Sequence, residues 1–251
     1  ISIAPSLDSQ LYTLPLSNES VIGVYEMGQK YAVVTSTQVI DAINNEKKQV
    51  ISIPLPSWEE SVDATKSDDG SLYILLKSSR IVRYANGEIK TVSIVSSVWS
   101  APPLWEKAKK IESFAGNIYL LSEDGMSIYR YKPVVWSFSS RSDSLLSTIV
   151  SPYAIQDFAI DKSLYLLRSN ISIERITTWS DVSRQTLIYK NLPSDVFPVT
   201  IDKEAARVIL SNRSQYVFII SKWDVVVFRP NTTTSLKPNE LSYLGTIDIV
   251  D

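Results

Sequence analysis

A short two-stranded pattern recurs five times along this chain. Each copy begins with an apolar run around a tyrosine and continues, after a turn, into a second strand-like run. The lead tyrosines are Tyr31, Tyr73, Tyr119, Tyr165 and Tyr216, which stand 42, 46, 46 and 51 residues apart. A period in this range indicates one supersecondary unit used repeatedly. The repeat therefore predicts an architecture before any single residue predicts a function.

Each repeat has the pattern of four short strands. In the unit that contains Tyr73, runs rich in Val, Ile, Thr and Tyr alternate with turns, and Asn86-Gly87 suits the positive φ angles of a two-residue hairpin. The predicted strands of this unit are 61–65, 71–76, 80–84 and 89–94. Four antiparallel strands in each repeat of this length are typical of a propeller blade. The predicted fold class is all-β, a β-propeller of four-stranded antiparallel blades.

One run resembles a known repeat family. Asp69-Gly70-Ser71-Leu72-Tyr73-Ile74-Leu75, followed by Ser79-Arg80-Ile81-Val82-Arg83-Tyr84, resembles the NHL repeat and related repeats of six-bladed propellers. The resemblance covers residues 20–246 unevenly, and it is good in the second and third units and loose in the first and last. The acidic residue that these repeats carry after the inner strand is replaced by Lys77, Ser122 or Arg168. The resemblance implies a fold and no activity, because packing alone can maintain such a pattern.

We expect residues 1–251 to form a single β-propeller domain. Five tyrosine motifs favour five blades, with six as the alternative. Residues 9–14 are strand-like and lie outside the five units, so joining them to the tail at 241–250 would close the ring and leave no exposed sheet edge. A pair of β-sandwiches is the main alternative fold.

Composition excludes several function classes. The chain has 251 residues, 44% of them hydrophobic, and a net charge of −2, which argues against nucleic acid as a partner. It has no cysteine and no histidine, which removes disulfides, cysteine zinc sites, the Ser-His-Asp triad and the commonest general base. No glycine-rich phosphate loop occurs. We therefore expect no cofactor and no metal, and no apolar run suggests insertion into a membrane.

The sequence alone does not decide the cellular compartment of the protein. The chain begins at Ile1, so we expect it to be part of a longer or processed protein. Four N-x-S/T sequons, at Asn18, Asn170, Asn212 and Asn231, favour an extracytoplasmic or cell-surface location. A cytoplasmic location is the alternative.

Two long inter-blade segments are the candidate contact surface. Residues 95–110 and 132–152 are longer than a closed propeller needs, and they are rich in large aromatic side chains. The candidate binding residues are Trp99, Trp105, Trp136 and Phe138. Tryptophan and tyrosine supply large anchors at low entropic cost, so we expect a protein or glycan partner here. The alternative is that these aromatic side chains cover the ends of neighbouring blades.

Three carboxylates are the candidates for chemistry. Asp63, Glu112 and Asp157 occur at similar places in successive lead-in strands, so the pseudo-rotation of a propeller could bring them into a ring around the channel. Paired carboxylates can cleave a glycosidic bond, and converging oxygens can bind Ca²⁺. The alternative is that each carboxylate accepts hydrogen bonds from a neighbouring strand or loop.

The sequence thus predicts a non-enzymatic interaction scaffold, exposed at the surface of a cell or outside the cytoplasm. The first alternative is a carbohydrate-active enzyme that uses the channel carboxylates. A second alternative is a WD40-like adaptor, against which the lack of a repeated Trp-Asp signature counts.

Overall fold

The computed structural model describes residues 19–28, 30–43, 49–56, 59–95, 105–135, 137–139, 143–144, 153–177, 183–193, 206–211, 215–221, 224–230 and 240–248. All regular secondary structure in these ranges is β-strand. Within them, no helical segment has the length and hydropathy needed to cross a bilayer.

In the described residues, five mainly antiparallel sheets follow one another along the chain, and we call them blades 1 to 5. Blade 1 consists of β1 (Val21–Glu26), β2 (Lys30–Thr35), β3 (Gln38–Ile43) and β4 (Gln49–Pro54). Blade 2 consists of β5 (Ser61–Lys66), β6 (Leu72–Leu76), β7 (Ile81–Ala85) and β8 (Glu88–Thr91). Blade 3 consists of β10 (Ala108–Phe114), β11 (Asn117–Ser122), β12 (Ile128–Tyr131) and β15 (Asp143–Ser144).

Blades 4 and 5 repeat this order. Blade 4 consists of β16 (Ile155–Ile160), β17 (Ser163–Arg168), β18 (Ile173–Thr177) and β19 (Ser183–Thr186). Blade 5 consists of β21 (Arg207–Leu210), β22 (Val217–Ile220), β23 (Asp224–Pro230) and β24 (Glu240–Asp248). Four short strands stand outside this order. They are β9 (Ile94–Val95), β13 (Pro133–Val134) and β14 (Ser137–Ser139), which form a small sheet, and β20 (Ile188–Lys190), which pairs in parallel with β24.

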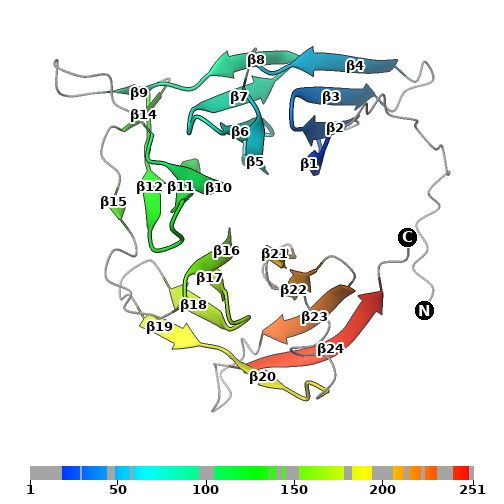
Figure 1. The fold of residues 1–251 in the computed structure, drawn as a ribbon, viewed down its shortest axis with the longest axis vertical. Helices are drawn as coiled ribbons and strands as arrows, with labels where there is room; N and C mark the ends of the chain where they lie inside the picture. The colour runs from blue at the N-terminus through cyan, green and yellow to red at the C-terminus, as the bar shows by residue number, and fades with distance from the viewer. Residues whose placement is uncertain are drawn as a thin grey trace.

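The blades stand around a central axis (Figure 1). The first strands of successive blades contact one another in the order β1, β5, β10, β16, β21. This arrangement is a β-propeller, as the repeat predicted, and it is not a pair of sandwiches. The tail strand β24 pairs with β23 and β20 inside blade 5, while residues 9–14 lie outside the described residues.

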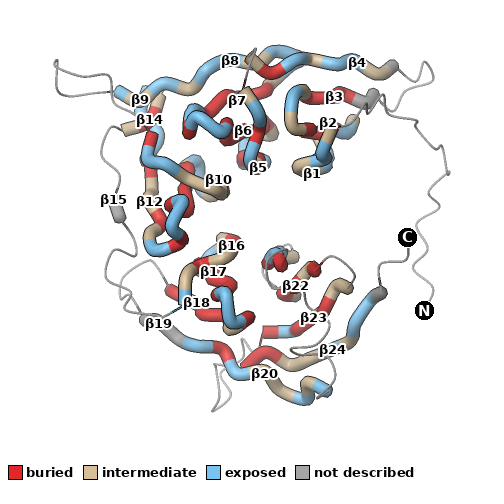
Figure 2. Tube along the Cα trace, in the orientation of Figure 1, coloured by how far each residue is buried: buried red, intermediate tan, exposed pale blue. Residues whose placement is uncertain are grey.

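The hydrophobic core lies between the blades. The buried side chains of the described residues form four clusters, and each cluster contains residues of two neighbouring blades. Strand β6 illustrates why: Ile74 and Leu76 belong to the cluster shared with blade 1, whereas Leu75 belongs to the cluster shared with blade 3. Successive side chains of a strand point to opposite faces, so a strand covered on both faces is apolar at nearly every position. Figure 2 shows this burial in the inner strands and more exposure in the outer strand β8.

Turn chemistry between β7 and β8 agrees with the sequence. Asn86 and Gly87 have φ angles of 53° and 81°. Two consecutive positive φ angles belong to the hairpin turn whose twist matches that of the flanking strands. Asn and Gly adopt this backbone at little cost, so the local sequence positions β8 beside β7.

Candidate functional site

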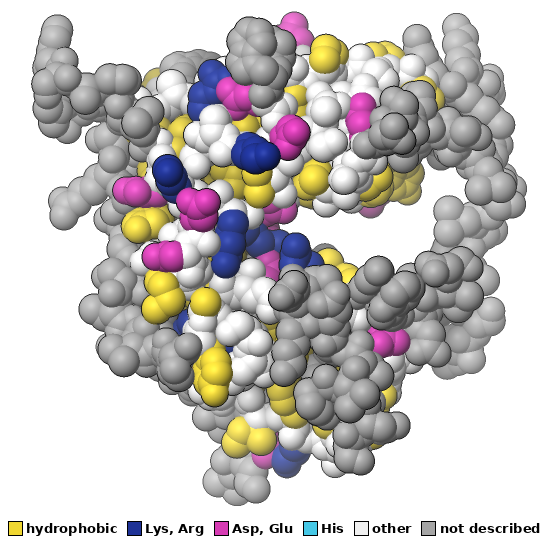
Figure 3. Space-filling model, in the orientation of Figure 1, with side chains coloured by type: hydrophobic (Ala, Val, Ile, Leu, Met, Phe, Trp, Pro, Cys, Tyr) yellow, Lys and Arg dark blue, Asp and Glu magenta, His cyan; other side chains and the backbone are white. Residues whose placement is uncertain are grey.

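A cavity of about 620 Å³ runs along the axis of the ring, and the first strands of all five blades contribute to its wall. Figure 3 shows the corresponding hollow, which has Lys and Arg side chains at its inner end. Apolar side chains of β1 and β21, among them Val24 and Ile209, are exposed beside charged side chains of β5 and β10. The cavity therefore has a mixed lining.

The three carboxylates singled out in the sequence lie close together around one lysine. The Nζ atom of Lys110 is 2.8 Å from Oδ1 of Asp157. Burial lowers the pKa of Lys110, but the negative charges of Asp63, Asp157 and Glu112 raise it. The three carboxylates outweigh the effect of burial, so the net shift is upward. Nothing in the sequence singles out Lys110 beyond its place in a short basic run. The structure places it at the centre of the group.

Strand register shows which of these residues are equivalent. β1, β5, β10 and β16 each have a register irregularity near their start, and the residues that follow it are Gly23, Asp63, Lys110 and Asp157. Lys110 thus stands in blade 3 where blades 2 and 4 have an aspartate. The prediction that Glu112 is the equivalent of Asp63 and Asp157 is wrong. Glu112 pairs with Tyr119 as Thr65 pairs with Tyr73 and Ala159 with Tyr165, so its equivalents are Thr65 and Ala159. The apolar pattern of a single strand does not reveal its pairing partners.

The two equivalent aspartates join neighbouring blades. Oδ2 of Asp63 in β5 accepts the backbone N–H of Ile111 in β10 at 2.8 Å. Oδ2 of Asp157 in β16 accepts the backbone N–H of Val208 in β21 at 2.7 Å. Asp157 is fully buried, and a buried carboxylate is stable only when it is paired and hydrogen-bonded. These contacts make the aspartates cross-links between blades.

Glu112 is held in a different way. Its Oε2 accepts the hydroxyl of Thr65 in blade 2 at 3.1 Å. Burial raises the pKa of Glu112 to about 8; Lys110 opposes this rise, while Asp63 and Asp157 add to it. Burial likewise raises the pKa of Asp63, against the effects of Lys110 and the Ile111 N–H. One lysine among three carboxylates leaves excess negative charge, which a proton on Glu112 reduces.

No group of three or more carboxylates in the described ranges is arranged to hold a metal ion. Ca²⁺ takes six to eight oxygen ligands. Here, Asp63 and Asp157 each direct one oxygen at a backbone N–H, and the other oxygen of Asp157 pairs with Lys110.

The aromatic candidates divide into two pairs. Trp99 and Trp136 lie outside the described residues. Trp105 and Phe138 are buried, with 9% and 5% of their surface exposed. Trp105 packs on Tyr131 with ring centroids 4.6 Å apart, and Phe138 meets Tyr73 edge-to-face at 5.9 Å. Trp105 and Phe138 thus belong to the core between blades 2 and 3, and their role in binding stays a prediction.

Two grooves lie beside the turns that follow the first strands of blades 1 to 3. The groove between blades 2 and 3, which we call the blade 2–3 groove, has a volume of about 580 Å³. Its apolar wall contains Tyr73, Val92, Val134 and Phe138. The small sheet that contains β13 and β14 supplies half of this wall. The groove is therefore a concave apolar surface at a blade junction, to which Pro133, Val134 and Phe138 contribute.

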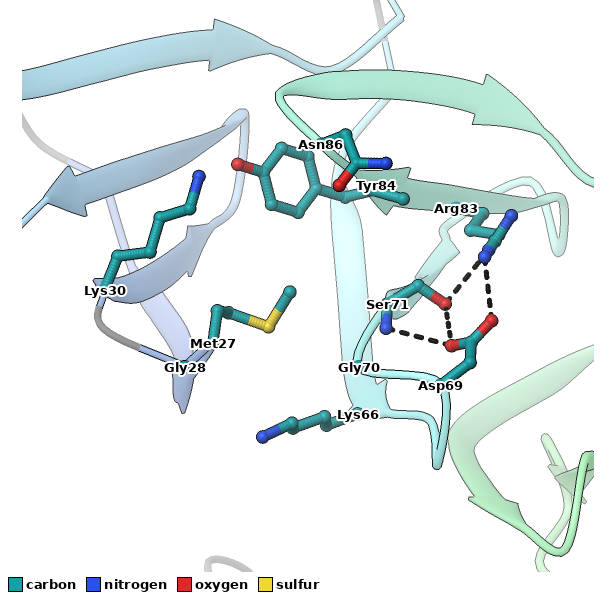
Figure 4. A pocket seen from close by; sticks show the side chains of 11 residues that line it. Met27, Gly28, Lys30, Lys66, Asp69, Gly70, Ser71, Arg83, Tyr84 and Asn86 are labelled. Atoms are coloured by element: carbon teal, nitrogen blue, oxygen red, sulfur yellow. Dashed lines mark hydrogen bonds and ion pairs between the residues drawn. The ribbon is translucent and has the colours of Figure 1, made fainter.

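The second groove, between blades 1 and 2, is smaller and polar, with a volume of about 340 Å³. Figure 4 shows Lys30 and Met27 on the blade 1 side and a hydrogen-bonded group on the blade 2 side. In that group, Arg83 donates to Asp69 at 2.7 Å and to Ser71 at 2.9 Å. Asp69 and Arg83 line both grooves, so this ion pair forms the ridge between them.

No family description and no curated protein matches the sequence. Solved structures do match. A protein of unknown function from Desulfotomaculum acetoxidans is 13% identical with a TM-score of 0.58, over 91% of this chain and 69% of that one. The extracellular domain of BT4673 from B. thetaiotaomicron is 12% identical with a TM-score of 0.57. The match covers 93% of this chain and 31% of that one. YCF48 bound to D1 peptide is 10% identical with a TM-score of 0.51. The match covers 87% of this chain and 66% of that one.

These likenesses support the propeller fold and nothing finer, because the identities are far below the level at which sites correspond. The chain spans about two thirds of two of these structures and about a third of the other.

The Glu112→Gln substitution tests the charge balance of the channel. Because the pKa of Glu112 is raised in the folded protein, its contribution to stability is complete below about pH 4.5 and is lost as the pH rises through about 8. Glutamine keeps the acceptor for Thr65 without the charge. Glu112 is half-buried, so solvent screens its charge. We therefore expect the variant to be more stable than the parent by about 1–2 kcal/mol at pH 9 and similar to it at pH 4.5.

Urea unfolding at pH 4.5, 7 and 9 measures this difference. Glu123→Gln, which neutralises an exposed carboxylate of the same blade, is the control and should leave the pH profile unchanged. Parallel pH profiles for the parent and Glu112→Gln would contradict the assignment.

Phe138→Ala tests the place of this side chain in the core. Removing a buried ring leaves a cavity, and we expect a loss of about 3 kcal/mol in the free energy of unfolding. Val135→Ala is the control, because Val135 is 84% exposed and should change stability by less than about 0.5 kcal/mol. Urea titrations of both variants give the answer, and a loss below about 1 kcal/mol for Phe138→Ala would argue for a contact role instead.

Proposed function

We propose that this β-propeller is a non-enzymatic binding protein that takes a segment of a partner protein in the blade 2–3 groove. The observation that carries the proposal is the groove itself. Its volume of about 580 Å³ lies within the range of ligand sites, and it combines apolar and aromatic walls with polar groups at the rim. Rigid aromatic side chains in a concave surface are typical anchors for a partner.

The rim of the groove adds polar partners for a bound segment. Lys90 and Thr91 of β8 stand on one side, and the Asp69–Arg83 ridge adds a charge of each sign. Arg83 has 44% of its side chain exposed, so it can approach a ligand without losing its contact with Asp69. An apolar floor with a charged rim suits a peptide that carries both kinds of side chain.

The solved structures support a partner of this kind by example. YCF48 binds D1 peptide, so a propeller of similar architecture takes a peptide. A glycan partner is the alternative, since aromatic walls also stack on sugar rings. The extracellular domain of BT4673 supports an extracytoplasmic or cell-surface location, as do the sequons of the sequence.

The carbohydrate-active alternative depends on the channel carboxylates. Glycoside cleavage needs two carboxyl groups that face the substrate. Asp157 is fully buried between Lys110 and the Val208 N–H, and Asp63 accepts the Ile111 N–H. The observation in favour of the enzyme is the raised pKa of Glu112, which suits a general acid. We give precedence to binding because the aspartates already serve as cross-links.

Selection of a displayed peptide library on the purified chain tests the proposal. The affinity of the recovered peptides is then measured by calorimetry for the parent, Val134→Asp and Val135→Asp. Val134 lines the groove, so a charge there should weaken binding at least ten-fold, or about 1.4 kcal/mol. Val135 is its neighbour but does not line the groove, and the same change there should have little effect.

The groove assignment would be contradicted if both variants lost the same peptide affinity. It would also be contradicted if the peptides bound Val134→Asp with the affinity that they have for the parent. A glycan array probed with the same proteins tests the glycan alternative. Hydrolysis of aryl glycosides that is abolished by Glu112→Gln would favour the enzyme.

A further inference from the structure

We propose that the mouth of the channel at the start of the first strands is an oxyanion site formed by Lys109 and Arg207, which takes a carboxylate or phosphate group. The site is a cavity of about 260 Å³ lined by Val62, Asp63, Lys109, Lys110, Gln156 and Arg207. It lies at the beginning of the strands whose following turns border the two grooves, so it is separate from the blade 2–3 groove and does not depend on the proposed function.

The charge of this mouth is positive. Three cations and one carboxylate line it. Lys110 is balanced by its ion pair with Asp157 and by the proximity of Asp63 and Glu112. The remaining cations, Lys109 and Arg207, form no ion pair with any carboxylate of the described residues within 4 Å. Within the part of the chain that the structure describes, their charges are therefore open to a ligand.

The carboxylates near Lys109 have other partners. Asp124 attracts Lys109, but its Oδ1 accepts the hydroxyl of Ser122 at 2.6 Å and the N–H of Met126 at 2.9 Å. Asp157, the other acidic neighbour, pairs with Lys110. These bonds hold both carboxylates at their own turn or blade junction.

Lys109 and Arg207 repel each other across the cavity. Burial lowers the pKa of Lys109, and the charge of Arg207 lowers it further, although Asp124 and Asp157 act in the opposite direction. An anion between two like charges removes this repulsion and gains charge-assisted hydrogen bonds.

Arg207 has the geometry for an oxyanion. It is exposed, and its Nη1 donates to the backbone oxygen of Ala206 at 3.1 Å. A guanidinium has five N–H donors in a planar fork, so most of its donors are available for a bidentate contact with a carboxylate or phosphate. The cavity volume suits one such group, and Val62, which is 38% exposed, can cover an apolar stem attached to it.

Two probes distinguish the sources of the oxyanion. Inorganic phosphate and N-acetylglutamate are titrated separately into the purified chain at constant ionic strength, and binding is followed by calorimetry and by the amide NMR signals of residues 108–110 and 206–208. We expect at least one probe to bind, with signal changes confined to this mouth. Binding of phosphate alone would indicate a phosphoryl ligand, and binding of N-acetylglutamate alone would indicate a carboxylate.

Arg207→Met should weaken this binding at least ten-fold, and Lys109→Met should do the same. Lys77→Met is the matched control, since it removes one positive charge from an exposed side chain away from the channel. It should leave the affinity unchanged. Arg207 is exposed, so its variant should fold, and the melting temperatures of all three variants verify this.

No binding of either probe, or equal weakening by Arg207→Met and Lys77→Met, would overturn the site. Neither result would bear on the peptide selection with Val134→Asp, because that experiment concerns the opposite end of the strands.

Discussion

Every blade of this molecule depends on its neighbours for burial of its apolar side chains. The four apolar clusters each contain side chains of two neighbouring blades. A single sheet of four strands exposes two faces, and neither face of an inner strand such as β6 is polar. Blade-to-blade packing is therefore the main source of hydrophobic stabilisation, at roughly 25 cal/mol for each Å² of apolar surface removed from water. The ring arrangement is the geometry that covers both faces of every inner blade.

Charged side chains complete these junctions at the channel, where apolar packing ends. Asp63 and Asp157 reach across to the peptide groups of the next blade, and Lys110 offsets the charge that they bring. A buried carboxylate without such partners would cost several kcal/mol. The acidic residues that looked like candidates for catalysis thus have a structural explanation. Lys109 and Arg207, at the channel mouth, form no such ion pair within the described residues.

The sequence predicted the fold because the signal was repeated. Five tyrosine motifs, each with the periodicity of a doubly covered strand, are hard to reconcile with any other β architecture, and the Asn86-Gly87 turn located one hairpin directly. The site was less accessible. The apolar pattern of one strand does not reveal which residues it pairs with on the next, so Glu112 took the place of Lys110 in the predicted ring. The pairing of Trp105 with Tyr131, and of Phe138 with Tyr73, joins segments whose contact depends on the packing of blades 2 and 3.

The hydrogen bonds of Asp63 and Asp157 have a consequence for how the blades can vary. Each aspartate binds a backbone N–H, which every residue except proline provides, so the receiving blade needs no particular side chain at Ile111 or Val208. A junction of this kind requires a particular residue, the aspartate, in only one of the two blades that it joins. Blades joined in this way can diverge at the receiving positions while the joint remains intact.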